Sequence, residues 1–359
     1  MSIIRSGFCP KPALDVALGS CRSISILRLV RSYSMRLPEY FVSCDWGTSS
    51  FRLRLVAFED FHVAAEFRES VGVRSIHDGL ADDAGAAERD AAFSGFLGAR
   101  LERLLADASS EIEVRHVALS GMASSTIGWR ELPYALAPLP VDGSTIPFER
   151  IPFSTGSGRE FELFLISGAR TDSDIIRGEE TEALGVYNDP RFEGRALGSL
   201  MIMPGTHCKH VLTEDRRIVA WRTFLTGELF EALTRHTILR QTTTAPDSEA
   251  APGPAVDVCF REGVTEGARN GMEAGLFQAR ARGVLSGATS AENRAFLSGV
   301  LIGSELRHAR QLAAGRPILL TGASDIRERY ASAFEILRET ESGAEGSVIV
   351  DLPEGAAAI

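Results

Sequence analysis

The chain has 359 residues, of which 44% are hydrophobic and 24% are charged, and its formal net charge is −10 at pH 7. This length predicts two globular domains, and the negative charge argues against a protein that binds nucleic acid, which needs clustered basic side chains. The five cysteines have no C-x-x-C spacing, so the sequence indicates neither a disulfide framework nor a cysteine zinc site. A reducing cytoplasm is the expected location.

The first 38 residues differ from the rest of the chain. They carry six basic side chains and one acidic one, Asp15. Their apolar run at 24–30 is too short to span a bilayer, which takes about 20 residues. Two interpretations stay open: a basic targeting leader, or an overlong start ahead of a functional first residue at Met35. In both cases we expect residues 1–38 to lie outside the fold.

The first predicted domain, residues 39–190, opens with two strands joined by a turn of small residues. An apolar run at 40–44 ends in Asp45, and the alternating segment 51–55 predicts an antiparallel second strand. The turn between them contains Gly47, Thr48 and Ser49. Backbone N–H groups in such a turn can hold a phosphate, and a carboxylate such as Asp45 can hold Mg²⁺. Taken alone, the pattern is more often that of a plain hairpin.

A helix over 81–108 and a strand over 114–119 continue this domain. The loop at 121–134 then mixes small, aromatic and basic side chains, among them Ser124 and Trp129. This composition suits a sugar-binding loop and a buried aromatic corner equally, and the sequence leaves both interpretations open.

Several carboxylates follow an arginine where the next helix is expected to begin. Arg177 and Gly178 precede Glu179 and Glu180 at the start of a predicted helix over 178–187. Phosphoryl transfer to a hydroxyl benefits from a carboxylate that accepts the proton. The helix macrodipole favours an acidic first turn in any case, so the pattern supports a catalytic role and a purely structural role equally.

The second predicted domain, residues 191–359, repeats the opening arrangement of the first. An apolar strand at 200–203 is followed by a turn with Gly205 and Thr206, and the chain returns through Lys209. Lysine occurs only twice in the whole chain, and its compact ammonium suits a phosphate. Two such turns on opposite domains are what a clamp around the phosphates of ATP requires, so the pair favours a nucleotide site over two coincidental hairpins.

Helices dominate the middle of this domain. Thr226 is predicted to cap a helix, and two long helices are expected over 263–285 and 291–314. Within the second of these, the small residues Gly299 and Gly303 indicate close packing against another soluble helix.

A strand at 318–320 leads into Gly322 and Ser324 at the start of a last helix. Glycine there lets a nucleoside approach, and a helix N-terminus favours negative charge, although such turns are common. His207 and His210 have no recognisable third ligand, so we expect no metal site made wholly of protein groups. The two similar halves predict α/β domains that face each other across a cleft.

Seven motifs occur in one order along the chain, namely CDWGTSSFRL, SGMASSTIGW, IIRGEETEALG, MPGTHCKHV, RTFLTGEL, FLSGVLIGSEL and LLTGAS. Together they resemble the 2-keto-3-deoxygalactonokinase family, a branch of the superfamily of sugar kinases, actin and the heat-shock chaperone ATPase. The resemblance runs from about Tyr40 to Phe334. It implies an α/β fold of two actin/hexokinase-like (ribonuclease H-like) domains around an ATP cleft. It also implies Mg²⁺-dependent transfer of a phosphoryl group from ATP to the C6 hydroxyl of 2-keto-3-deoxygalactonate, in galactonate breakdown.

The resemblance also implies the site residues, motif by motif. The first phosphate loop is matched by Asp45, Gly47, Thr48 and Ser49, with Asp45 toward Mg²⁺, and the second loop by Gly205, Thr206 and Lys209. The adenosine region is matched by Gly303, Gly322 and Ser324. For the carboxylate that faces the acceptor hydroxyl, the first choice is Glu180 and the second is Glu179. The residues expected near the sugar acid, whose carboxylate favours a bidentate arginine, are Arg52, Ser124, Trp129 and Arg177.

Two features depart from the family pattern, and other functions stay open. The basic leader has no counterpart in the family, and a closing helix expected after 348–350 is cut short. The alternatives are a kinase of another sugar acid, an exopolyphosphatase-like phosphohydrolase, and a non-catalytic sugar-acid sensor. We expect a small-molecule sugar acid as the partner, with no nucleic acid and no membrane, and a homo-oligomer stays open.

Overall fold

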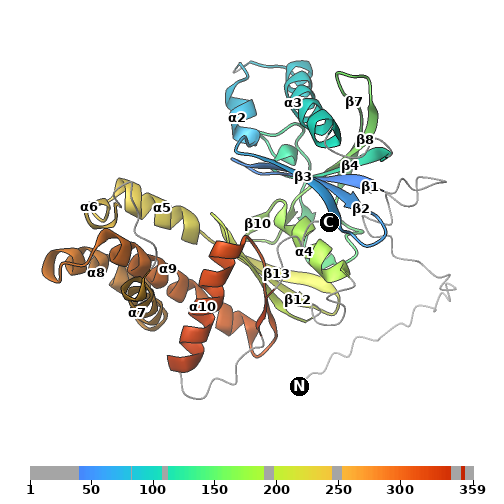
Figure 1. Cartoon of the computed structure of the whole chain (residues 1–359). Coiled ribbons are helices and arrows are strands. Elements are labelled where there is room, and N and C mark those ends of the chain that lie inside the picture. Colours follow the sequence, from blue (N-terminus) through green and yellow to red (C-terminus); the bar gives the residue numbers. More distant parts are fainter. Residues whose placement is uncertain are drawn as a thin grey trace, which may run out of the picture.

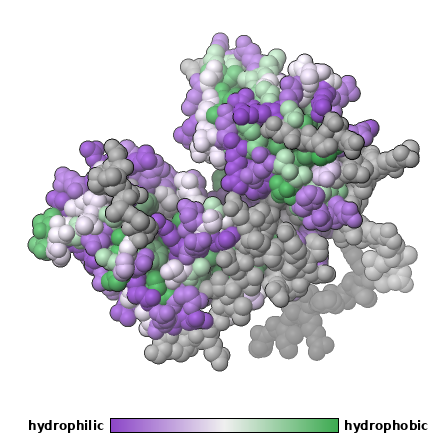
Figure 2. Space-filling view, viewed as in Figure 1, coloured by the Kyte–Doolittle hydropathy of each residue, from purple (hydrophilic) through white to green (hydrophobic). Residues whose placement is uncertain are grey.

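The computed structural model describes residues 40–81, 83–106, 112–189, 198–244, 253–340 and 349–351. The leader at 1–38 and the expected short closing helix lie outside these residues. Two six-stranded sheets with helices packed on them form two lobes (Figure 1). The surface is hollowed between the first lobe and the helices of the second (Figure 2). The predicted architecture of two α/β domains is confirmed.

The first sheet has the strand order β3-β2-β1-β4-β8-β7. Its strands are β1 (Tyr40–Trp46), β2 (Phe51–Ala57), β3 (Val63–Glu69), β4 (Val114–Gly121), β7 (Phe148–Ser154) and β8 (Glu160–Ile166). The first three form an antiparallel meander, whereas β4 runs parallel to β1 and β8 runs parallel to β4. Helix α3 (Ala86–Ala106) packs on one face, where Trp46, Phe93 and Leu97 are part of the buried core.

The opposite face of this sheet carries polar side chains. Asp45 and Arg52 are directly paired across β1 and β2, and residues paired in an antiparallel ladder point to the same face. Cys44 and Trp46, the neighbours of Asp45, are buried in the core on the other face, because side chains alternate along a strand. Asp45 and Arg52 therefore point away from α3. They point toward α4 and the second lobe.

The second sheet has the strand order β15-β14-β11-β12-β13-β6. Its strands are β6 (Leu139–Pro140), β11 (Leu200–Met203), β12 (Cys208–Glu214), β13 (Arg217–Phe224), β14 (Ile318–Leu320) and β15 (Ile349–Asp351). β11 and β12 form an antiparallel hairpin, and β14 runs parallel to β11. In the first sheet, β1 and β2 form the same kind of hairpin, and β4 runs parallel to β1. The predicted repetition of the opening arrangement is confirmed.

Residues before the predicted boundary at 190 contribute to both lobes. β6 pairs with β13 of the second sheet, and α4 (Glu179–Asn188) places Leu184 and Tyr187 in the same core as Met201 of that sheet. A small third sheet consists of β5 (Ala135–Leu136), β9 (Ala169–Arg170) and β10 (Ile175–Ile176). The boundary itself stays a prediction.

The helices of the second lobe are α5 (Thr226–His236), α6 (Arg240–Thr243), α7 (Pro254–Asn270), α8 (Met272–Leu285), α9 (Ser290–Ala313) and α10 (Ser324–Thr340). The prediction of one helix over 263–285 is wrong. Gly271 separates α7 from α8, and its φ of 80° interrupts a right-handed helix. None of the helices in the described part of the chain is long and apolar enough to cross a membrane.

The predicted cap of α5 is also wrong. Thr226 is the first helical residue, Leu225 occupies the cap position, and no side chain caps the helix there. The Thr226 hydroxyl donates instead to the carboxylate of Glu305 on α9. This interaction joins residues that are far apart in the sequence, so the local pattern gave no sign of it.

Candidate active site

The first predicted phosphate loop is a hydrogen-bonded turn between β1 and β2. The Gly47 N–H donates to the Ser50 carbonyl oxygen (2.9 Å). Backbone N–H groups of helix α2 (Val73–Asp78) donate to the carbonyl oxygens of Gly47 and Thr48 (2.9 and 3.2 Å). Ser49 is exposed and Thr48 is half-buried. Helix α2 thus fixes the turn from behind and leaves its tip open to solvent.

Four carboxylates gather where this turn meets the start of α4. Asp45 comes from β1, and Glu179, Glu180 and Glu182 come from the first turn of α4. Asp45 interacts electrostatically with Glu179 and with Glu182. Although Asp45 reaches the surface, loss of surrounding water raises its pKa; Arg52 opposes this shift and Glu179 adds to it.

Glu180 and Glu182 of this cluster are both surrounded by protein, which raises their pKa values. Glu180 has no exposed surface, and its carboxylate accepts hydrogen bonds from the Gly178 N–H (2.8 Å) and the Thr181 hydroxyl (3.0 Å). Burial first, and the charge of Glu179 second, raise the pKa of Glu180 to about 7. Loss of surrounding water, followed by the nearby carboxylates, raises the pKa of Glu182 to about 7 as well.

Glu182 is a residue of this cluster that was not predicted from the sequence. Its spacing of three residues from Glu179 places both side chains on one side of helix α4, and that spacing is the signal that would have identified it. The Glu182 carboxylate also interacts with Thr321, which directly follows β14. Glu182 therefore lies between the acidic cluster and the predicted adenosine region.

Lys209 joins the second loop to the acidic cluster. Its ammonium lies 2.8 Å from the Glu179 carboxylate and donates to the His207 carbonyl oxygen (3.2 Å), and its side chain is only 6% exposed. Glu179 accepts a further hydrogen bond from the Arg177 N–H (2.9 Å). The structure thus brings together the lysine and the acidic segment, which the sequence identified separately.

The second loop is held by the beginning of α5. The Glu228 N–H donates to the Thr206 carbonyl oxygen (3.0 Å). A Cβ on Gly227 would lie 2.5 Å from the Gly205 carbonyl oxygen, so this close approach of the backbones requires glycine. Gly205 and Thr206 themselves are exposed and are open to a ligand.

The residues predicted to bind adenosine separate into two groups. Gly322 follows β14 and Ser324 begins α10. A Cβ on Gly322 would lie 3.6 Å from the Pro204 carbonyl oxygen, so this turn lies beside the second loop. Gly303 is buried in the contact between α9 and α7, where a Cβ would collide with the backbone of Val264. The expected close helix packing is confirmed, and a contact of Gly303 with nucleotide stays a prediction.

The residues predicted near the sugar acid do not form one surface. Arg177 donates to the carbonyl and hydroxyl oxygens of Ser124 (2.6 Å each), and Ser124 has no exposed surface. Trp129 is 3% exposed and its indole N–H donates to Asp90 (2.6 Å). Of the two interpretations of this loop, Trp129 therefore fits the buried aromatic corner. Arg52 is half-buried and has no hydrogen bond or ion pair to another described residue.

The structure has two α/β lobes, each with a strand–turn–strand unit, and the lysine of the second unit contacts Glu179 of α4, which lies near Asp45 of the first unit. These features define an actin-like sugar kinase or ATPase. A family model described as 2-keto-3-deoxy-galactonokinase matches residues 45–349. The chain belongs to this family of sugar-acid kinases, which use ATP.

Similar proteins of known name agree with this assignment. The chain is 33% identical over 316 residues to a protein of Rhizobium meliloti (strain 1021) named probable 2-dehydro-3-deoxygalactonokinase DgoK1, which covers 84% of this chain and 90% of that protein. It is 26% identical over 305 residues to the 2-dehydro-3-deoxygalactonokinase of Escherichia coli (strain K12), covering 83% and 90%. A solved structure described as a 2-dehydro-3-deoxygalactonokinase protein from Sinorhizobium meliloti superposes with a TM-score of 0.67 at 29% identity, covering 89% of this chain and 96% of that one.

Proposed function

We propose that this chain transfers the terminal phosphoryl group of ATP to the C6 hydroxyl of 2-dehydro-3-deoxy-D-galactonate, giving the 6-phosphate and ADP. The names of the relatives support this substrate. The observation that carries the proposal is the contact between Lys209 and Glu179, because it joins a phosphate-binding cation of one loop to carboxylates that lie beside the other loop.

The two loops offer complementary contacts to the phosphates of ATP. The turn at 47–49 supplies backbone N–H groups and hydroxyls from the first lobe, and the turn at 205–206 supplies backbone N–H groups from the second. The Lys209 ammonium exchanges Glu179 for a phosphate oxygen when nucleotide binds, since the two anions compete for one cation. The adjoining turn at 322–324 is proposed to contact adenosine, together with Gly303 of α9.

The acidic cluster fits a magnesium ion. Asp45 reaches the surface, where a cation can approach it. Loss of surrounding water first, and the neighbouring carboxylates second, raise the pKa of Glu182 beside it, and a bound cation would offset both effects. Mg²⁺, when bound, neutralises charge on the phosphates and orients them. Asp45 is the residue proposed to hold it, directly or through water.

A glutamate of α4 is proposed to accept the proton of the acceptor hydroxyl. The sequence favoured Glu180 over Glu179, yet Glu180 has no exposed surface, whereas 27% of the Glu179 side chain is exposed. A base must come within hydrogen-bond reach of the hydroxyl, so exposure supports Glu179 for this contact. Glu180, which bonds to the Gly178 N–H, then orients the turn. Movement of Lys209 to a phosphate frees the Glu179 carboxylate to act.

Arg52 is proposed to bind the substrate carboxylate. It shares a face of the first sheet with Asp45 and has no hydrogen-bonding partner within the described chain. Burial first, and the charge of Arg54 second, lower the pKa of Arg52, and a bound anion would offset both effects. A planar guanidinium also matches a carboxylate bidentately. Ser124 and Arg177, bonded to each other, are proposed to shape the adjoining wall.

The thiols agree with the proposed cytoplasmic location. Cys44, Cys208 and Cys259 are free and buried, and such thiols persist in a reducing compartment. We propose that the enzyme acts there on a soluble sugar acid.

The test is the release of ADP from Mg-ATP with five additions: 2-dehydro-3-deoxygalactonate, its gluconate epimer, galactonate, galactose, and no acceptor. We expect turnover with the first acid alone, and none from the Asp45→Asn variant. Turnover confined to another acid would replace the proposed substrate, and ADP release without an acceptor would indicate a phosphohydrolase. Binding of the acid by folded protein without turnover would indicate a sensor.

A further inference from the structure

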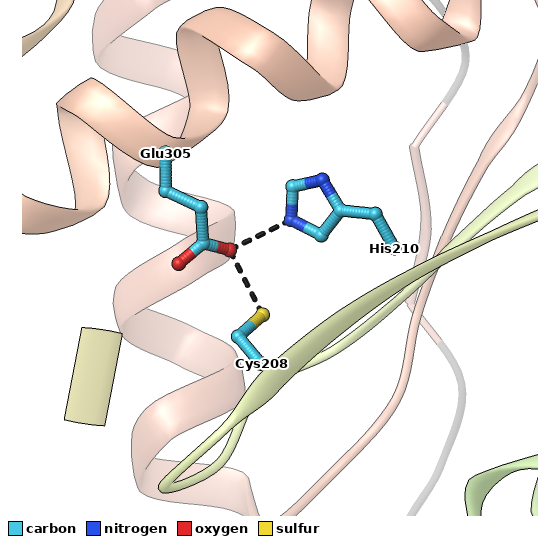
Figure 3. Close-up of side chains that lie close together, drawn as sticks. All are labelled: Cys208, His210 and Glu305. Carbon is cyan, nitrogen blue, oxygen red and sulfur yellow. Dashed lines mark hydrogen bonds and ion pairs between the residues drawn. The ribbon is translucent and has the colours of Figure 1, made fainter. Parts of the chain in front are cut away.

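A buried carboxylate lies beneath the second phosphate loop. The Glu305 side chain is 1% exposed. Its Oε1 accepts hydrogen bonds from the Cys208 thiol (2.8 Å) and from His210 Nε2 (2.7 Å) (Figure 3). Its Oε2 accepts from the hydroxyls of Tyr330 (2.8 Å) and Thr226. Burial raises the pKa of Glu305, but these hydrogen bonds, led by that of His210, lower it below its ordinary value. Four donors surround the two oxygens, which suits an ionised carboxylate.

The donors come from elements that carry the predicted ATP contacts. Cys208 and His210 lie on β12, directly after the loop. Thr226 begins α5, whose following residues contact the loop backbone. Tyr330 lies on α10, which begins at the predicted adenosine turn. One carboxylate on α9 therefore ties together the second phosphate loop, the helix that holds it, and the helix after the adenosine turn.

Because side chains alternate along β12, the contacts of Glu305 also fix the direction in which Lys209 points. Cys208 and His210 both point toward Glu305, so Lys209 between them points to the opposite side of the strand. On that side it meets Glu179. A rotation or shift of β12 would therefore move the ammonium away from the acidic cluster.

We propose that Glu305 is a positioning residue, whose buried carboxylate holds the second phosphate loop and Lys209 in the arrangement that binds the phosphates of ATP. This inference rests on the proposed function, because it presumes that the loop binds ATP. Cys208, His210 and Glu305 would also make a plausible ligand set for zinc. However, each Glu305 oxygen already accepts two hydrogen bonds, and His210 Nδ1 has no partner among the described residues, whereas a metal-bound histidine normally donates through its second nitrogen.

The test is the affinity for Mg-ATP, measured by calorimetry at a temperature where circular dichroism reports folded protein. Glu305→Gln keeps the size of the side chain but removes its charge and replaces one acceptor with an amide donor. We expect Kd to rise about tenfold or more, with the KM for the acceptor changing less than about threefold. Cys208→Ser keeps a donor to Oε1 and should retain the wild-type Kd. Leu105→Ala, a buried change in α3 of the other lobe, controls for lost stability.

Wild-type affinity in folded Glu305→Gln protein would overturn the inference. No ATP binding by the wild-type protein would overturn the proposed function instead. One equivalent of zinc in purified wild-type protein, lost in the variant, would also overturn the inference in favour of a metal site. If Glu305→Gln does not fold, Tyr330→Phe carries the test, because it removes one donor: an increase in Kd of about threefold is expected, and an unchanged Kd would refute the positioning role.

Discussion

Glu180→Gln is predicted to make the protein more stable at alkaline pH. The Glu180 carboxyl is fully buried, and its pKa is raised from 4.5 to about 7. A native pKa above the unfolded value means that the native state binds the proton more tightly. The contribution of Glu180 to stability is therefore fully present below pH 4.5 and is lost as the pH rises through 7. Glutamine has nearly the same shape and stays neutral, so the variant avoids this loss.

The size of the effect follows from the displacement of the pKa. Each unit corresponds to about 1.4 kcal/mol. The rise from 4.5 to about 7 therefore gives the variant an advantage of roughly 3 kcal/mol in free energy of unfolding at pH 8. At pH 5 the same relation leaves less than about 1 kcal/mol. The amide oxygen can still accept from the Gly178 N–H and the Thr181 hydroxyl. The amide nitrogen takes the place of the oxygen that lies 2.8 Å from the Gly178 nitrogen, a cost that does not depend on pH and leaves the change with pH intact.

The assay is thermal unfolding of the variant and the wild type between pH 5 and pH 8, in EDTA so that no divalent cation stabilises the ionised cluster. The control is Glu131→Gln, which changes an exposed carboxylate and should shift the transition little at any pH. We expect the Tm advantage of Glu180→Gln to grow with pH. A difference in Tm between variant and wild type that does not change between pH 5 and pH 8 would refute the effect of burial on Glu180.

Three further changes separate binding from folding. Lys209→Met should raise the KM for ATP by about tenfold or more, measured by ADP release in folded protein; an unchanged KM would exclude a phosphate contact. Gly227→Ala places a Cβ 2.5 Å from a backbone oxygen of the second loop and should weaken ATP binding, whereas Gly85→Ala, with no atom within 4 Å, should not. Trp129→Phe removes the hydrogen bond to Asp90 and should lower stability by about 1–3 kcal/mol with little change in the KM for the sugar acid; a large rise in that KM would restore Trp129 to the substrate site.

Features set by local patterns were predictable from the sequence. The strand–turn–strand units at 40–55 and 200–212 combine alternation with small turn residues, and both occur in the structure within a few residues of the expected bounds. The lone lysine at 209 stood out because the remainder of the basic residues in the body are arginines. These signals are local because a turn and its two strands are adjacent in the chain.

Features set by tertiary contacts were not predictable. Glu305 lies 95 residues from His210, and no spacing in the sequence indicates that the two meet. The loop composition around Trp129 is the same whether its indole faces a ligand or the core, and only the packed structure distinguishes these positions. The break at Gly271 likewise depends on its backbone conformation, since glycine is tolerated in helices at a modest cost.

The central claim is that a phosphoryl group passes from ATP to the C6 hydroxyl of 2-dehydro-3-deoxy-D-galactonate. The most direct measurement is phosphorus–proton correlation NMR of the product formed from Mg-ATP and this acid by the full-length protein. We expect a single phosphate monoester whose phosphorus couples to the two protons on C6, and no such product from the Asp45→Asn variant. Inorganic phosphate as the only product, or a phosphorus that couples to protons on a carbon other than C6, would contradict transfer to the C6 hydroxyl.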